Sequence, residues 1–283
     1  MATNHLTIRF PVKSPDDARK VAGKLPPMMP EFFKALDDIG TVHYSRFTLV
    51  DDKTLVYLAD FDGEFSELMQ SMAKYGGPVF DAVFEHVVNP PSMPAADNVE
   101  AFVEWTADHL MHPALVFSAY PGVTVKQIKA LASAAGVTGG GLVLPFLVIL
   151  PSKSHLAYIE MQLLIRTLNA KAQRDLAKVG TPHMVQFVPL GHDQIGFFTA
   201  YDGSFDKYIL DFTKSIGEVF DLVFKFTKGA PPSPCRKFVQ EFIDFAASAN
   251  REPIGFYQAY PGLSNQDIHA LLADSKAEAA SAQ

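Results

Sequence analysis

Hydrophobic and polar residues alternate in several short stretches of this chain, the first of them at residues 5–12. There Leu6, Ile8 and Phe10 fall on one side, and the residues between them are polar or charged. Strict alternation of this kind is typical of a strand with one buried face. The same reasoning, with helical spacing for the helices, predicts the remaining elements of the first half: strands at 42–50, 55–61 and 114–120, and helices at 14–23, 30–39, 64–75, 79–87, 98–110 and 124–135.

The second half of the chain repeats the first with a constant offset of 140 positions. The segment Ala119-Tyr120-Pro121-Gly122 returns as Ala259-Tyr260-Pro261-Gly262, and Asp62-Gly63 returns as Asp202-Gly203. Ungapped self-similarity at a fixed period indicates a tandem duplication. We therefore expect two domains, residues 1–140 and residues 141–283, joined at the glycine-rich run 137–141.

Each repeat has the element order βαββαβ with trailing helices, which is the ferredoxin-like split βαβ order. In the second repeat the predicted helix at 154–179 stands where the first repeat has two shorter ones. A sheet with helices on one face leaves its other face bare, and two such sheets can cover each other. The predicted fold is therefore α+β, with two tandem ferredoxin-like repeats forming an α/β barrel and the helices outside.

Composition narrows the functional classes. The net charge is −7, the isoelectric point is near 5.7 and no run of Lys or Arg occurs, which argues against a nucleic-acid partner. The single Cys235 excludes an intrachain disulfide framework and a thiolate-rich metal site. The most apolar run, residues 141–151, is too short to span a bilayer. We expect a cytoplasmic protein that is not bound to membranes.

Two histidines, His43 and His183, are matched by the duplication, each at the start of a predicted strand. One interpretation is structural: each ring donates to a backbone carbonyl and fixes the entry of the strand. The other is functional, because neutral imidazole suits both a general base and a metal ligand. The pattern leaves both interpretations open.

Differences between the repeats indicate a second candidate site. Arg9 corresponds to Ile149, Arg46 to Gln186 and Tyr44 to Met184. If these positions line the space between the sheets, one side of it is polar and cationic and the other is apolar. Such a lining suits a small amphipathic or anionic molecule, with arginine binding a carboxylate through forked hydrogen bonds. The alternative is that Arg9 and Arg46 pair with acids such as Asp60.

The segments His43-Tyr44-Ser45-Arg46-Phe47, Phe61-Asp62-Gly63 and Ala119-Tyr120-Pro121-Gly122 resemble bacterial proteins grouped with the dye-decolourising peroxidases, within the dimeric α/β-barrel proteins. Those peroxidases carry a Gly-x-x-Asp-Gly motif beside haem. Here the matching segment is Ala59-Asp60-Phe61-Asp62-Gly63, with Ala in place of the first Gly. The resemblance implies haem as a cofactor, Arg46 and His43 as distal catalytic groups, and Arg9, Tyr44 and His183 as cofactor-binding residues.

Three functions are compatible with the sequence. The first is a peroxidase-like oxidoreductase acting on a small organic substrate. The second is a non-catalytic carrier or sensor for an amphipathic organic acid, in which the same arginines bind the ligand. The third is a structural barrel that binds nothing and pairs with another subunit, for instance as a homodimer.

Overall fold

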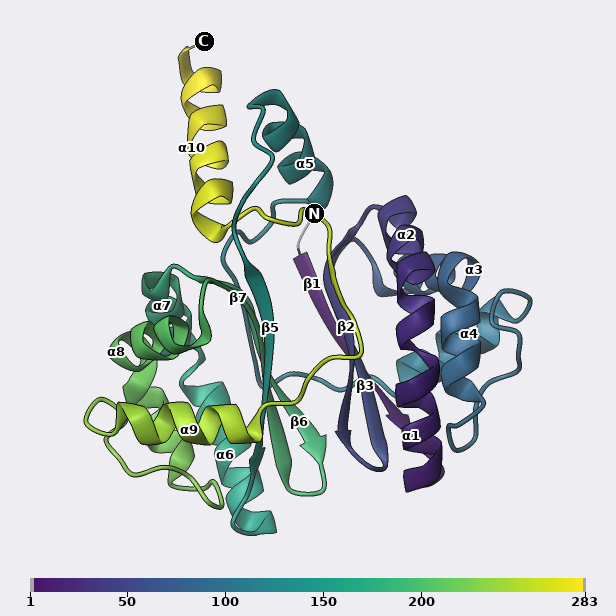
Figure 1. Ribbon diagram of the computed structural model, residues 1–283, viewed down its shortest axis with the longest axis horizontal. Coiled ribbons are helices and arrows are strands. Elements are labelled where there is room, and N and C mark those ends of the chain that lie inside the picture. Colours follow the sequence, from purple (N-terminus) through teal and green to yellow (C-terminus); the bar gives the residue numbers. More distant parts are fainter. Residues whose placement is uncertain (1–2, 282–283) are drawn as a thin grey trace. The chain divides into compact units, whose positions relative to one another are not determined.

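The computed structural model describes residues 3–281, and they divide into two compact units. The first unit comprises the residues up to Met111 together with Pro121–Lys129 and Glu252–Tyr260. The second unit comprises His112–Tyr120, Ala130–Arg251 and the residues from Pro261 on. Each unit contains one four-stranded antiparallel sheet with helices packed on it (Figure 1). The expected α+β class is confirmed.

The sheet of the first unit has the strand order β1-β3-β2-β8. Strands β1 and β2 both run antiparallel to β3, which lies between them, so β1 and β2 with their connecting helices form a split βαβ unit. A register shift between Val42 and Tyr44 places His43 at an irregularity of β2. The strands are β1 (Thr3–Pro11), β2 (Val42–Asp51), β3 (Thr54–Asp62) and β8 (Phe256–Gln258).

Helices cover one face of this sheet, and aromatic side chains fill the space between them (Figure 1). Phe47 and Tyr57 from the sheet meet Phe32 and Phe80 from the helices, with ring centroids 5.5 to 6.1 Å apart. These rings are almost fully buried, so they carry much of the core's hydrophobic stabilisation. The helical elements of the first unit are α1 (Pro15–Lys24), the 3₁₀ turn η1 (Pro26–Met28), α2 (Met29–Ile39), α3 (Phe65–Phe84) and α4 (Val99–Asp108).

Helix α3 continues through Gly76-Gly77-Pro78, where the sequence predicts a break, so that prediction is wrong. The physical reason is packing. A β-carbon at position 76 would lie 2.8 Å from the Phe32 ring, so glycine leaves room for that ring against the helix. Burial of α3 along its length outweighs the poor helix propensity of these three residues.

The second unit repeats the plan with the strand order β4-β6-β7-β5. The helix expected at 154–179 is instead two helices that meet at Leu168, so the single-helix prediction is wrong. Helix α5 (Val125–Ala134) begins in the first unit and ends in the second. The other elements are β4 (Leu115–Ser118), β5 (Val143–Pro151), β6 (Pro182–Gly191), β7 (Gln194–Asp202), α6 (His155–Thr167), α7 (Asn169–Val179), α8 (Phe205–Phe224), α9 (Val239–Ala249) and α10 (Asn265–Ser281).

Each sheet takes its fourth strand from the other repeat. Strand β8 belongs to the C-terminal repeat but pairs with β2 of the first sheet, with Gln258 opposite Tyr44. Strand β4 belongs to the N-terminal repeat but pairs with β6, with Leu115 opposite Phe187. Each unit is therefore assembled from both repeats. The expected division of the chain into domains at residue 140 stays a prediction.

No closed barrel is found among the strands of residues 3–281, which form two separate sheets. The outer edge of β1 meets a short segment through the bridge between Ile8 and Leu110, and the outer edge of β5 meets Asn250 in the same way. Both edges are thus covered by irregular chain rather than by a further strand. The tandem ferredoxin-like barrel stays a prediction.

Candidate functional site

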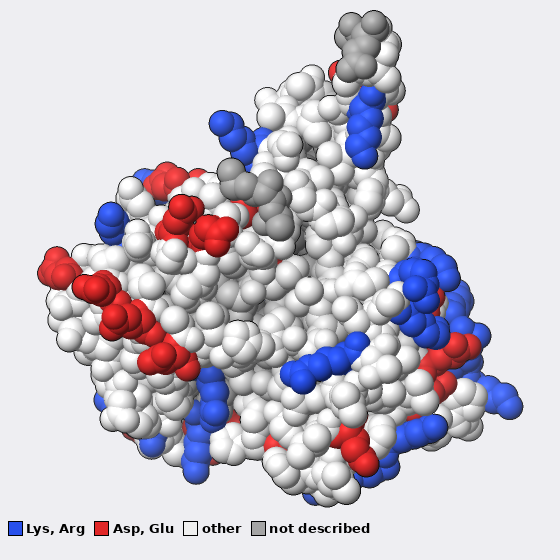
Figure 2. All heavy atoms as spheres, turned by 180° about the vertical axis from the view of Figure 1, so that it is seen from behind, with Lys and Arg blue, Asp and Glu red and all other residues white. Residues whose placement is uncertain are grey.

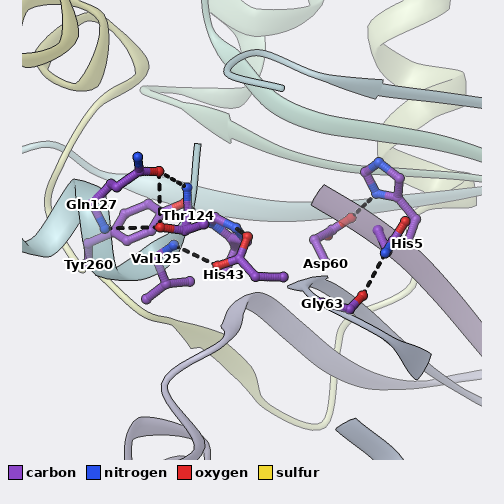
Figure 3. A network of polar contacts seen from close by, with 10 residues as sticks. His5, His43, Asp60, Gly63, Thr124, Val125, Gln127 and Tyr260 are labelled. Atoms are coloured by element: carbon purple, nitrogen blue, oxygen red, sulfur yellow. Dashed lines mark hydrogen bonds and ion pairs between the residues drawn. The ribbon is translucent and has the colours of Figure 1, made fainter. Parts of the chain in front are cut away.

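The matched histidine of the first unit lies in a buried cluster of three side chains. The Nε2 atom of His43 is 2.9 Å from Oδ1 of Asp62, and its Nδ1 atom is 2.8 Å from the hydroxyl of Tyr260 (Figure 3). The second carboxylate oxygen of Asp62 accepts the backbone N–H of Val125, the first residue of α5, at 2.8 Å. Because an ionised carboxylate can only accept, Nε2–H of His43 donates to Asp62 and neutral Nδ1 accepts from the tyrosine hydroxyl.

The second unit contains the same cluster at the offset of 140 positions. Nε2 of His183 is 2.7 Å from Oδ1 of Asp202, and Nδ1 is 3.0 Å from the hydroxyl of Tyr120. Oδ2 of Asp202 accepts the backbone N–H of Asn265, the first residue of α10, at 2.7 Å.

We call these sets the two His–Asp–Tyr clusters. In both, the tyrosine follows the strand that comes from the other repeat, so the hydrogen bond attaches the exchanged segment to its sheet. A feature that both units need for assembly explains why His, Asp-Gly and Tyr-Pro-Gly all recur in the sequence. The geometry supports the structural interpretation of the matched histidines, although the ring partners are side chains and not backbone carbonyls.

A different set of polar side chains shares one face of the first sheet. Residues that are directly opposite in neighbouring antiparallel strands project to the same face. His5 and Tyr44 are both opposite Asp60, and Thr7 and Arg46 are both opposite Leu58. We call this set the polar face of the first sheet; its members are His5, Thr7 and Arg9 of β1, Val56, Leu58 and Asp60 of β3, Tyr44, Arg46 and Thr48 of β2, and Phe256 and Gln258 of β8.

Three charged or titratable side chains form the centre of the polar face. Nδ1 of His5 is hydrogen-bonded to Oδ1 of Asp60, and the two side chains point toward each other from β1 and β3 (Figure 3). Asp60 and Arg46 are almost completely buried, at 2% and 4% exposure. Burial lowers the pKa of Arg46 from 12.5 to about 10, and the nearby negative charge of Asp60 opposes this change. Arg46 therefore stays positively charged at neutral pH.

The second sheet shows that the fold does not require these charges. The positions that match His5, Asp60 and Arg46 are Pro145, Ala200 and Gln186, and the strands keep the same register there. The ring of Phe198, at the position of Leu58, lies over Gly196, where a β-carbon would be 2.5 Å from it. In the second unit an aromatic ring thus occupies part of this face. The polar residues of β1, β2 and β3 on this face are replaced as follows: His5 by Pro145, Thr7 by Leu147, Arg9 by Ile149, Tyr44 by Met184, Arg46 by Gln186, Thr48 by Val188 and Asp60 by Ala200.

The structure brings together some of the residues that the sequence selects. Arg9, Tyr44 and Arg46 share the polar face, and β3 lies between the strands that carry the two arginines. His43 is held in the first His–Asp–Tyr cluster, and His183 belongs to the second unit. His5 and Asp60 were not selected as site residues. The difference between Asp60 and Ala200 in the two repeats indicates position 60 in the sequence, because it accompanies the difference between Arg46 and Gln186.

The residues present do not fit a haem site. Both ring nitrogens of His183 are engaged, by Asp202 and by Tyr120, so iron ligation would have to break one of these bonds. Asp62, which matches the aspartate of the peroxidase motif, uses one oxygen for His43 and the other for Val125. Within residues 3–281 no group of three His, Cys, Asp or Glu side chains is arranged to hold a metal ion.

The distribution of charged side chains on the surface does not indicate a binding site. Acidic and basic side chains both appear on the face shown in Figure 2, separated by broad areas of uncharged residues. None of the helices in the described part of the chain is both long enough and apolar enough to cross a membrane. The candidate site therefore rests on charges buried in the polar face.

Comparisons with known proteins do not identify a family. No protein-family model matches the chain, and no curated protein matches it. Among solved structures, a candidate monooxygenase from Lactobacillus acidophilus NCFM is 8% identical, with 90% of this chain and 96% of that chain covered and a TM-score of 0.33. An anthrone oxidase-like protein is 11% identical, with 93% and 95% covered and a TM-score of 0.34.

A candidate monooxygenase from Fusobacterium nucleatum subsp. nucleatum is 10% identical, with 92% and 95% covered and a TM-score of 0.30. TM-scores this low do not establish a common fold, so nothing is transferred from these proteins to this chain. The resemblance to dye-decolourising peroxidases is likewise not shown by any of these comparisons.

Proposed function

We propose that the polar face of the first sheet binds a small amphipathic organic anion. The observation that supports this is the contrast between the two sheets: one register carries His5, Asp60 and Arg46, and the other carries Pro145, Ala200 and Gln186. Burying charged groups lowers the stability of a fold unless the groups are paired, and the second unit keeps the same strand register without these charges. Charges that are kept in one repeat despite this loss of stability therefore indicate a function for them.

The chemistry of the face matches an anion with an apolar body. Arg46 and Arg9 are permanent cations at neutral pH, and a guanidinium can bind a carboxylate through two parallel hydrogen bonds. With neutral His5, the two arginines and Asp60 leave one net positive charge on the face. Val56, Leu58 and Phe256 on the same face offer apolar contacts. His5 and Arg9 of the same face are half-buried, so they are the charged or titratable members of the face that solvent reaches.

Thermal shift measurements against a panel of carboxylates test this proposal. The panel contains straight-chain fatty acids, aryl acetates and the corresponding alcohols as neutral controls. We expect the acids to raise the melting temperature and the alcohols not to, because a carboxylate forms charge-assisted hydrogen bonds with a guanidinium that a neutral alcohol cannot match. Arg46→Gln, which places the second repeat's residue in the first, should abolish the shift, whereas Arg166→Gln on α6 of the second unit should leave it unchanged. Equal shifts for acids and alcohols would contradict the proposal.

An oxidoreductase that acts on the same molecule is the second candidate. The observation that favours it is the hydrogen bond between His5 and Asp60, because it holds Nδ1–H of His5 on the carboxylate and leaves Nε2 as the atom that can take a proton. In a peroxidase-like reaction the organic substrate would lose two electrons and two protons, and hydrogen peroxide would take them up to give two waters. His5 would relay one of these protons.

Peroxide consumption in the presence of the binding carboxylate separates the two candidates. A carrier or sensor should not raise the rate of peroxide consumption above the rate measured without protein. An oxidoreductase consumes one peroxide for each substrate oxidised, and His5→Gln should lower that rate while the carboxylate still binds. Consumption that His5→Gln leaves unchanged would contradict a role for this histidine.

A further inference from the structure

A groove on the helical side of the first unit has a composition that the fold does not explain. It lies where η1 and the start of α2 meet the middle of α3, and its volume is about 440 Å³, within the range of small-molecule pockets. Most of the lining is apolar or aromatic, with Glu31 as the only charged residue in it. The lining includes Met28, Glu31, Phe32, Tyr75, Pro78 and Val79.

The matching positions of the second unit carry an ion pair. There Lys171, at the position of Glu31, forms an ion pair of 3.4 Å with Glu218, at the position of Pro78. This pair connects α7 to α8 across the site that corresponds to the groove. In the first unit the lysine is replaced by an acid and the acid by a proline, so the internal cation is lost while one carboxylate remains.

The carboxylate of Glu31 has no cation of its own. No Lys, Arg or His among residues 3–281 lies within 4.0 Å of it, in contrast to the acids on the surface of α1 and α7. Glu31 is exposed, so its carboxylate is accessible from the solvent. It supplies one fixed negative charge at the edge of an apolar groove.

Pro78 and Tyr75 set the chemistry of the α3 side of the groove. Pro78 has no N–H, so it cannot donate to the carbonyl of Lys74 one turn earlier in α3. The Tyr75 side chain is 60% exposed at the groove, and the face of its ring can attract a cation. The carboxylate of Glu31 and the aromatic face of Tyr75 together favour a cation over an anion.

From these observations we infer that the groove binds a small primary amine with an aromatic or alkyl body. The ammonium group lies beside the Glu31 carboxylate, and the ring of Tyr75 is the other lining group that attracts a cation. The body lies on Met28, Phe32 and Val79, where it buries apolar surface. This site is separate from the polar face of the first sheet, and the inference does not depend on the function proposed there.

Titration of the full chain with three related probes, followed by protein NMR, tests the inference. The probes are 2-phenylethylamine, the neutral 2-phenylethanol and the anionic 3-phenylpropanoate. We expect the amine to shift the amide signals of Gly76 and Val79 in a saturable way, and to bind several-fold more tightly than the alcohol. Equal binding of amine and alcohol, tighter binding of the anion, or shifts that do not include these amides would overturn the inference.

Substitutions provide the matched controls. Glu31→Gln keeps the shape and removes the charge, and it should weaken amine binding about fivefold, as expected for one partly exposed ion pair with a cation–π contribution. Glu31→Lys combined with Pro78→Glu copies the ion pair of the second unit and should remove amine binding. Glu100→Gln, an exposed acid on α4, should bind the amine like the unmodified chain. Unchanged affinity in Glu31→Gln would also overturn the inference.

Discussion

The hydroxyl of Tyr260 is 2.8 Å from Nδ1 of His43, a residue 217 positions earlier in the chain. This contact connects the segment after β8, which comes from the C-terminal repeat, to the second strand of the N-terminal repeat. Tyr120 and His183 make the reciprocal contact at 3.0 Å in the second unit. Each unit is thus fastened by a buried hydrogen bond between the two repeats.

Removing either tyrosine hydroxyl should destabilise the protein without changing ligand binding. Tyr260→Phe leaves Nδ1 of His43 buried without its donor, which typically costs about 1 to 3 kcal/mol. Tyr120→Phe should cost a similar amount through His183, and the two effects should add because the clusters share no residue. Urea denaturation of the single and double variants measures this. Unchanged stability in both single variants would show that the contacts do not hold the exchanged strands.

Asp60 is hydrogen-bonded to His5 and acts electrostatically on the buried Arg46, so replacing it should destabilise the fold. Asp60→Ala removes one of two interacting buried charges, which typically costs about 3 to 5 kcal/mol. The double substitution Asp60→Ala with Arg46→Gln copies the second repeat and should recover most of that loss. A double-mutant cycle by chemical denaturation gives the coupling energy. Additive losses would mean that the two side chains do not interact.

Stability should fall steeply in alkaline solution. Burial raises the pKa of Tyr201 to about 12, and it raises the pKa values of Tyr57 and Tyr208 as well. In the unfolded chain these phenols lose their protons near pH 10, whereas the folded protein retains them, so unfolding becomes more favourable as pH rises above 10. Arg46 acts in the opposite direction, because its pKa is lowered to about 10, but it is a single group, and the pKa values of Tyr257 and Cys235 are raised by burial as well.

The ultraviolet absorbance of tyrosinate, recorded with circular dichroism during a pH titration, checks this expectation. Ionisation of the buried tyrosines should coincide with loss of helix signal. Tyr57→Phe combined with Tyr208→Phe should move the transition to higher pH. Ionisation of all tyrosines near pH 10 with the fold intact would contradict the burial of these residues.

A chain ending at residue 140 should not remain a monomer. It lacks β8, so the edge of β2 is uncovered, and its own β4 has lost β6. Because Ala119-Tyr120-Pro121-Gly122 matches Ala259-Tyr260-Pro261-Gly262, β4 of one copy can take the place of β8 in a second copy. Size-exclusion chromatography with light scattering should show a dimer or larger aggregates. A folded monomer would contradict the requirement for strand exchange.

The local elements of the fold could be predicted from the sequence because they follow from local chemistry. The alternation of Leu6, Ile8 and Phe10 correctly indicates β1, and Ser14, whose side chain accepts from the N–H of Asp17, correctly indicates the start of α1. The continuity of α3 could not be predicted in this way. It depends on the fit between Gly76 and Phe32, which are far apart in the sequence.

The exchange of β4 and β8 between the two sheets could not be predicted from the sequence for a related reason. In a duplicated chain, β4 and β8 occupy matched positions and are followed by the same Ala-Tyr-Pro-Gly segment, so pairing within a repeat and pairing between repeats satisfy the same local pattern. The arginines of the candidate site were visible as differences between the repeats. The partnership of His5 with Asp60 was not, because it requires the register of β1 against β3.

Anion binding at the polar face is tested most directly by a calorimetric titration with the carboxylate that gives the largest thermal shift. It compares the unmodified chain with the double variant Arg46→Gln, Asp60→Ala, which carries the second repeat's residues at the polar face. We expect saturable heat of binding to the unmodified chain, no heat of binding to the double variant, and similar melting temperatures for the two proteins. Binding of equal affinity to the double variant would show that the charges of the polar face do not hold the anion.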